Sequence, residues 1–212
     1  MNNTINIVWF RQDLRLEDNP ALSKAAENNA RILPIYILDD ENAGSWGMGE
    51  ASRWWLHKSL ESLNGSLDEN LHFFIGKADE IIPDLIEKTK AAGIYWNRCY
   101  EPWRISRDKE IKTSLLNNNI TVRSFNGSLL FEPPNIKKKD ATPYKVFTPF
   151  YKKGCLENGP IPRDLLACPS KLIFEKDVVS KKLSELNLLP SINWYQNIED
   201  TWSPGEKGAH QR

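Results

Sequence analysis

Residues 5–26 read INIVWFRQDLRLEDNPALSKAA, and this stretch carries the local signals that decide the fold. Residues 5–10 are apolar and rich in β-forming side chains, which is typical of a buried strand. Asn19 and Pro20 then mark a helix start, because asparagine caps N–H groups and proline suits the first helical position. Between strand and helix, RQDLRLED places five charges in eight residues. The stretch therefore predicts a buried strand, a charged turn and a helix in succession.

The same alternation of strand and helix continues to about residue 125. Further apolar runs predict strands at 32–38, 71–75, 94–98 and 120–125, and the segments between them predict helices at 49–67, 78–92 and 105–116. We expect Gly93 to end the helix 78–92 as a left-handed C-cap. Because the strands are unbroken apolar runs, helices should cover both sheet faces. We therefore predict an α/β fold with a doubly wound, five-stranded parallel sheet, whose sites lie at the carboxyl ends of the strands.

The remainder of the chain loses this rhythm. Proline recurs throughout residues 131–212, and only 180–189 has helical character. Such a length of irregular chain is too long for a loop inside a compact domain. We predict an α/β domain at 1–130 and an irregular connector at 131–212 that lies across a surface. The last segment, GEKGAHQR, has helix-forming character without a stop signal, so we expect the parent protein to continue beyond Arg212.

Composition excludes several classes of protein. Lys plus Arg and Asp plus Glu both number 28, so no global basic charge points to nucleic-acid binding. Three cysteines without a C-x-x-C spacing indicate a reduced, intracellular protein. The three histidines are scattered, and no segment resembles a signal peptide or a membrane span. We expect a cytoplasmic monomer with no membrane contact, no metal site and no catalytic residues of its own.

Four stretches together resemble the DNA photolyase and cryptochrome family. VWFRQDLRLEDNPAL (8–22) is similar to its W-F-R-x-D-L-R-x-x-D-N-x-A-L opening, and ASRWWLHKSLESLNGSL (51–67) resembles its S-R-W-W-L-x-x-S-L helix. PYKVFTPFYK (143–152) is similar to the Y-x-V-F-T-P-F segment of the interdomain connector. WSPGEKGA (202–209) resembles the W-x-P-G-E-x-x-A stretch before the helical flavin domain. The four blocks run in family order across nearly the whole chain.

This resemblance implies a division of labour. The α/β domain is expected to hold an antenna chromophore, and the connector is expected to lead to a helical domain that binds FAD and damaged DNA. The parent is implied to be a carbon–carbon lyase that repairs UV-induced pyrimidine dimers by light-driven electron transfer from FAD. The flavin-binding T-S-x-L-S-P type of motif is not found here, so the chain alone is not expected to catalyse. A cryptochrome-type blue-light receptor and a freestanding adenine-nucleotide-binding domain remain as alternatives.

We expect the chromophore to lie where the second and fourth strands end. Arg53 and Glu101 correspond to residues that hold a deazaflavin in the family, although an Arg53–Glu101 ion pair could merely join the rim. The Asn-Glu pair of folate-using members is replaced here by residues 102–104, PWR, which favours a deazaflavin or FMN over methenyltetrahydrofolate. GSWGMG at 44–49 matches no phosphate-loop pattern, so a rim loop is favoured there. The predicted pocket residues are Asp39, Trp46, Met48, Arg53 and Glu101.

Two groups of residues are predicted to face the helical FAD domain. The charged-loop residues Arg11, Asp13 and Arg15 are expected to stiffen the rim, partly by pairing with one another, and simple internal ion pairing is the alternative. An apolar cluster in the irregular connector also needs a partner that buries it. Its members are Tyr144, Phe147 and Phe150.

Overall fold

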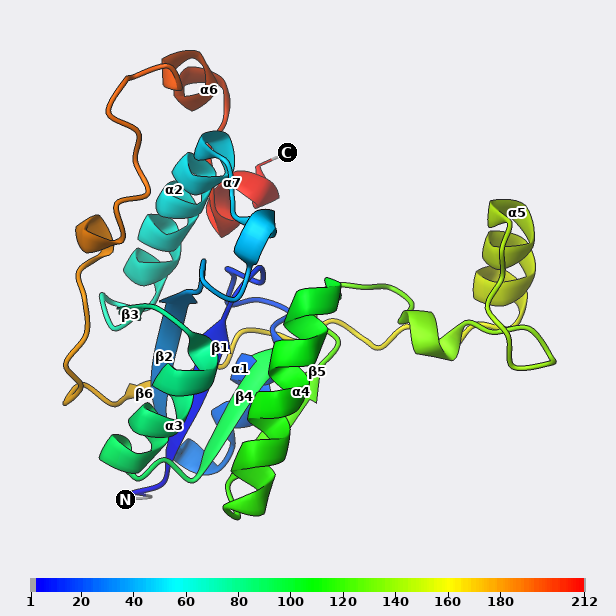
Figure 1. Cartoon of the computed structure of the whole chain (residues 1–212), viewed down its shortest axis with the longest axis horizontal. Helices are drawn as coiled ribbons and strands as arrows, with labels where there is room; N and C mark the ends of the chain where they lie inside the picture. Colours follow the sequence, from blue (N-terminus) through cyan, green and yellow to red (C-terminus); the bar gives the residue numbers. More distant parts are fainter. Residues whose placement is uncertain (1–2, 212) are drawn as a thin grey trace.

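A parallel sheet forms the centre of the molecule (Figure 1). The computed structural model describes residues 3–211, so residues 1–2 and 212, the outer ends of the two predicted parts, lie outside it. Every strand pair is parallel, and the order is β3-β2-β1-β4-β5. The five strands are β1 (Ile5–Phe10), β2 (Arg31–Leu38), β3 (His72–Ile75), β4 (Gly93–Asn97) and β5 (Thr121–Phe125). The predicted α/β fold is confirmed.

Helices cover both faces of this sheet, as the unbroken apolar strands require. The helices are α1 (Pro20–Ala25), α2 (Glu50–Ser66), α3 (Ala78–Thr89) and α4 (Pro102–Asn117). Val8 and Phe10 point to the face covered by α1 and α2. Ile7 and Trp9 point to the opposite face, where they pack with side chains of α3 and α4. Alternate residues of β1 therefore contribute to two separate cores.

The ends of α1 and α3 show where local signals succeed and fail. Asn19 caps α1, because its side-chain oxygen accepts a hydrogen bond from the Leu22 N–H at 3.1 Å. Gly93 does not cap α3, so that prediction is wrong. The left-handed residue is Lys90, with φ of 54°, and Gly93 opens β4 instead. A Cβ on Gly93 would lie 3.0 Å from the Thr121 carbonyl oxygen, so close strand packing explains the glycine.

The connector first leaves the sheet and then returns to it. Figure 1 shows an arm, formed by α5 (Phe147–Pro149) and a π-helix (Phe150–Glu157), that projects away from the sheet. The chain comes back as β6 (Ile173–Phe174), which pairs in parallel with the start of β2 and gives the sheet a sixth strand. The predicted 180–189 helix is a 3-10 turn at Leu183–Leu186. Two short helices, α6 (Gln196–Thr201) and α7 (Glu206–His210), follow.

His72 on β3 joins the sheet edge to the returning connector. Its Nδ1 lies 3.1 Å from the Ser180 hydroxyl, and its Nε2 lies 3.4 Å from the Glu175 carbonyl oxygen. The Glu175 carboxylate is itself buried and pairs with Arg31 at 2.9 Å. Burial lowers the pKa of His72 below its ordinary value. The folded protein therefore favours the neutral ring.

We expect this histidine to make stability depend on pH. The unfolded chain takes up a proton near the ordinary pKa of histidine, whereas the folded chain resists it, so the free energy of unfolding should fall as pH drops below about 6.5. His72→Gln removes this contribution, so urea unfolding of the variant should show a smaller loss between about pH 7.5 and pH 5. Parallel curves for the two proteins would contradict the assignment.

Within residues 3–211, no helix combines the length and apolarity needed to cross a bilayer.

Candidate functional site

A cavity of about 1290 Å³ opens at the carboxyl edge of the sheet. Its walls come from the ends of β1 and β2, the loops that follow them, the starts of α2 and α4, and the end of the connector. This volume is larger than that of most small-molecule sites. Aromatic side chains supply much of the lining, namely Trp9, Tyr36, Trp46, Trp55 and Trp103. The cavity has the size and lining to hold a large planar ligand.

The structure brings four of the five predicted pocket residues to this cavity. Asp39 and Glu101 lie in its wall, and Trp46 and Met48 line it from the loop before α2. Trp46 is 77% exposed, which places it at the mouth. Arg53 is not a lining residue.

Arg53 is instead held at the end of β2. Its Nη2 lies 2.6 Å from the Asp40 carboxylate, and its Nε donates to the Met48 carbonyl oxygen at 3.0 Å. Glu101 accepts a hydrogen bond from the Gln12 amide at 2.6 Å and lies 3.7 Å from Arg104. The alternative of an Arg53–Glu101 pair is therefore wrong, because each residue has a nearer partner.

Asp39 organises the loop and is itself buried. Its carboxylate accepts hydrogen bonds from the Ala78 N–H at 3.2 Å, at the start of α3, and from Arg107 at 3.0 Å. It also accepts from the Asn42 N–H at 3.1 Å. Asp39 therefore holds the cavity wall in place and offers a ligand no unpaired carboxylate.

Arginines and tryptophans alternate along one wall of the cavity. Arg107 lies 4.7 Å from the Trp9 ring centre and 4.9 Å from that of Trp103. Arg11 lies over Trp9 at 4.8 Å, and Arg104 lies over Trp103 at 4.8 Å. In each contact the positive guanidinium is attracted by the quadrupole of the indole ring, which stabilises the charged arginine. We did not predict this stacking from the sequence, although Trp103 and Arg107 have the i, i+4 spacing that places two side chains on one helix face.

Tyr36 and Glu101 of the cavity wall have shifted pKa values. Burial raises the pKa of Tyr36 far above its ordinary value, so its hydroxyl remains a neutral donor. Burial also opposes ionisation of Glu101, but its own backbone N–H, Arg104 and Gln12 together hold the pKa of this carboxyl below its ordinary value. At neutral pH the wall thus presents a carboxylate from Glu101 and a hydroxyl from Tyr36.

Comparison with known proteins decides the family. A family model described as DNA photolyase matches residues 6–168. The chain belongs to the DNA photolyase family. The deoxyribodipyrimidine photo-lyase of Agrobacterium fabrum is 42% identical over 208 residues, which cover 96% of this chain and 42% of that protein. Cryptochrome-2 of Arabidopsis thaliana is 35% identical over 214 residues, which cover 96% of this chain and 34% of the relative.

A solved structure agrees with this assignment. A bacterial class III photolyase from Agrobacterium tumefaciens matches with a TM-score of 0.90 and 40% identity, covering all of this chain and 44% of that one. The chain therefore spans less than half the length of each of these relatives. Photolyase-family membership and fold are thus established over nearly the whole chain, while the activity of a complete protein is a matter for proposal.

The charged loop of this photolyase-family chain is an internal network. Arg11 pairs with Asp108 and donates to the Asn97 carbonyl oxygen. Asp13 accepts hydrogen bonds from the Asn97 amide at 2.6 Å and from the Arg11 N–H at 2.9 Å. Arg15 donates to the Gly127 carbonyl oxygen at 2.6 Å. The side chains of Arg11 and Asp13 therefore pair with other elements and not with each other, whereas Arg15 also donates within the loop, to the Asp18 carbonyl oxygen at 2.8 Å. The burial of Arg11 and Asp13 favours the internal alternative for these two.

The apolar cluster of the connector is more exposed to solvent than Arg11 and Asp13. Phe147 is 73% exposed and stacks on Tyr151, with ring centres 5.7 Å apart. Tyr144 and Phe150 meet edge to face at 6.3 Å. Phe147, Phe150 and Tyr151 belong to the projecting arm, and Tyr144 precedes it by three residues. A partner that covers them stays a prediction.

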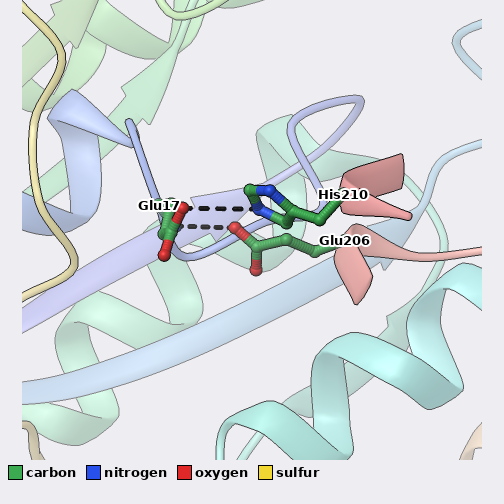
Figure 2. Close-up of side chains that lie close together, drawn as sticks. All are labelled: Glu17, Glu206 and His210. Atoms are coloured by element: carbon green, nitrogen blue, oxygen red, sulfur yellow. Dashed lines mark hydrogen bonds and ion pairs between the residues drawn. The ribbon is translucent and has the colours of Figure 1, made fainter. Parts of the chain in front are cut away.

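The family motif at 202–209 closes one side of the cavity. Figure 2 shows Glu17 of the charged loop beside Glu206 and His210 of α7. Glu206 accepts hydrogen bonds from the N–H groups of Leu16 at 2.9 Å and Glu17 at 2.8 Å, and His210 lies 3.3 Å from the Glu17 carboxylate. The three side chains place possible metal-ligand atoms within 4.8 Å of one another. Both Glu206 oxygens already accept backbone hydrogen bonds, so the carboxylate joins α7 to the charged loop. We call this connection the clasp.

Proposed function

We propose that this chain is the light-harvesting part of a photolyase-like flavoprotein. It binds a planar chromophore in the cavity, and the chromophore transfers excitation energy to an FAD held by a helical domain of the parent protein. The observation that carries this proposal is the large aromatic cavity at the carboxyl edge of a photolyase-family sheet. Energy transfer requires no nucleophile, only an oriented dye, and an aromatic cavity with a few polar groups can orient one.

The parent protein is proposed to split UV-induced pyrimidine dimers with electrons from the photoexcited FAD. Damaged DNA would contact the helical domain, and the arm with Tyr144, Phe147 and Phe150 would dock on that domain. The 42% identity to a deoxyribodipyrimidine photo-lyase supports this function. The 35% identity to a cryptochrome supports a second candidate, a blue-light receptor. Blue-light repair of a dimer-containing oligonucleotide by the parent protein would separate the two.

We propose distinct roles for the predicted pocket residues. Trp46, Met48 and Glu101 contact the chromophore, since they line the cavity. Asp39 and Arg53 support the wall through their own partners. The preferred chromophore is a deazaflavin or FMN, because the Asn-Glu pair of folate-using members is replaced by Pro102 and Trp103.

Titration of the purified chain tests this function. Riboflavin, FMN and methenyltetrahydrofolate are added in turn, and quenching of ligand fluorescence gives each Kd. We expect one flavin per chain, and Glu101→Gln should weaken flavin binding about tenfold, as for loss of a charge-assisted hydrogen bond. Glu110→Gln, an exposed change on α4, the helix that begins directly after Glu101, serves as the control. Folate binding without flavin binding would contradict the chromophore choice, and tight ATP binding alone would favour the adenine-nucleotide alternative.

A further inference from the structure

We propose that Glu206 is a positioning residue that couples the cavity to the connector. When a ligand occupies the cavity, it stabilises the docking of α7, and this docking strengthens ligand binding in return. The inference rests on the proposed function, because it assigns a regulating element to the same site. Glu206 acts through the charged loop, whose backbone it holds.

The cavity wall is shared by segments far apart in the sequence. Leu14, Arg15 and Glu17 contribute from the charged loop, whereas Glu206 and His210 contribute from α7. The Glu206 carboxylate connects these two segments through the two N–H groups of Leu16 and Glu17, which lie about 190 residues earlier in the chain. A carboxylate that accepts two backbone hydrogen bonds fixes the loop more firmly than a neutral acceptor does. Glu206 therefore sets the position of one wall relative to the other (Figure 2).

The connector also contacts α2, through Trp55 in the cavity wall and through Trp54 and Lys58 outside it. Tyr195 stacks on Trp54 with ring centres 5.4 Å apart, and Trp202 meets Trp55 edge to face at 6.4 Å. Glu199 on α6 forms an ion pair with Lys58 of α2 at 2.8 Å. Glu199 does not line the cavity, so its ion pair tethers the connector to α2 without contact to the site.

Gly205 explains why α7 can approach α2 so closely. Its φ of +97° lies in the region that favours glycine, and an added Cβ would clash with the Ser62 hydroxyl on α2. The glycine immediately before Glu206 thus allows the carboxylate to reach the charged loop. Within the 202–209 motif, the backbone of Gly205 and the carboxylate of Glu206 thus both hold α7 against the cavity.

Thermodynamic linkage makes the coupling reciprocal. A ligand that touches both walls binds the docked arrangement better than the undocked one, so it shifts the equilibrium toward docking. Docking must then strengthen ligand binding by the same factor by which the ligand favours docking, and a variant with a weakened clasp, whose α7 is partly undocked, binds the ligand more weakly in proportion to the lost docked fraction. The charge of Glu206 matters here, because glutamine keeps one acceptor oxygen and turns an N–H donor toward the loop's own donors.

The test compares Glu206→Gln with Glu199→Gln in the full chain, using riboflavin as the probe. We expect Glu206→Gln to raise the Kd for riboflavin about tenfold and Glu199→Gln to change it by less than about twofold, although both remove a connector tether. In the wild-type chain, riboflavin should slow amide hydrogen exchange in residues 14–18 and 205–210 together. The projecting arm at 147–157 should show no change.

The outcomes separate this inference from the proposed function. If the wild-type chain binds no flavin, the proposed function fails, and the coupling fails with it. If flavin binds with equal affinity to wild type and Glu206→Gln, only the coupling is overturned. Should the variant not fold, the exchange measurement on wild type decides, because ligand binding without protection of 205–210 also overturns the inference. Equal loss of affinity in both variants would assign Glu206 a merely structural role.

Discussion

Asp13→Ala should lower the free energy of unfolding by about 3–5 kcal/mol, as expected when a buried charged acceptor is removed from its partners. Asp13 is 4% exposed and accepts hydrogen bonds from Asn97, from the Arg11 N–H and from Asn19 at 3.3 Å. Without the carboxylate, the buried Arg11 N–H and one hydrogen of the Asn97 amide lose their acceptor. Urea unfolding followed by circular dichroism gives the difference.

The control for this prediction is an exposed acid of the same type. Asp84 pairs with Lys88 at 2.7 Å on the surface of α3, so Asp84→Asn should change stability by at most about 0.5 kcal/mol. A small effect of Asp13→Ala on the isolated chain would contradict the internal network. In that event, a role for the charged loop in docking the FAD domain would again become the better explanation.

Arg107→Met should produce a loss of similar size, about 3–5 kcal/mol, and should abolish flavin binding. The Arg107 guanidinium joins Asp39 at 3.0 Å and Asp108 at 2.8 Å, and it separates the rings of Trp9 and Trp103. Methionine fills much of the volume but leaves the Asp39 carboxylate buried without a cation. The wall between α3 and α4 should then rearrange, since Asp39 also holds the start of α3.

Two further variants sharpen the Arg107 experiment. Arg107→Lys keeps the charge but not the planar fork, so a partial loss is expected. Arg53→Met removes a pair that is partly exposed, with side chains 26% and 38% accessible, and should cost at most about 1 kcal/mol. Equal effects of Arg53→Met and Arg107→Met on stability would show that burial of the Arg107 network does not matter.

The cavity has a consequence for how a complete protein would work. Its walls come from the α/β domain and from the connector, whose α7 closes one side. A chromophore in the proposed site would therefore touch both parts. Under the proposed function, light harvesting would depend on the contacts of Glu206 with the charged loop.

Much of the fold could be predicted because its signals are local. The unbroken apolar run at 5–10, the cap at Asn19 and the proline at Pro20 act within a few residues of one another. Such signals identify strands and helices one at a time, and their alternation implies a parallel sheet. A strand of two residues is too short to show a periodic pattern, so β6 could not be predicted from the sequence. The tertiary structure identifies it, because Ile173 and Phe174 pair with Arg31 and Ile32 at the start of β2.

The candidate site was likewise predictable in part from the sequence and in part only from the tertiary structure. Sequence by itself determined which segments meet, because the carboxyl ends of parallel strands share one edge of a sheet. Only the tertiary structure decided that Arg53 pairs with Asp40, that Arg107 is the buried cation, and that Glu206 closes the cavity. The physical reason is that an ion pair depends on the distance between two side chains in space, and a chain with 28 residues of each charge offers many partners of equal merit in sequence.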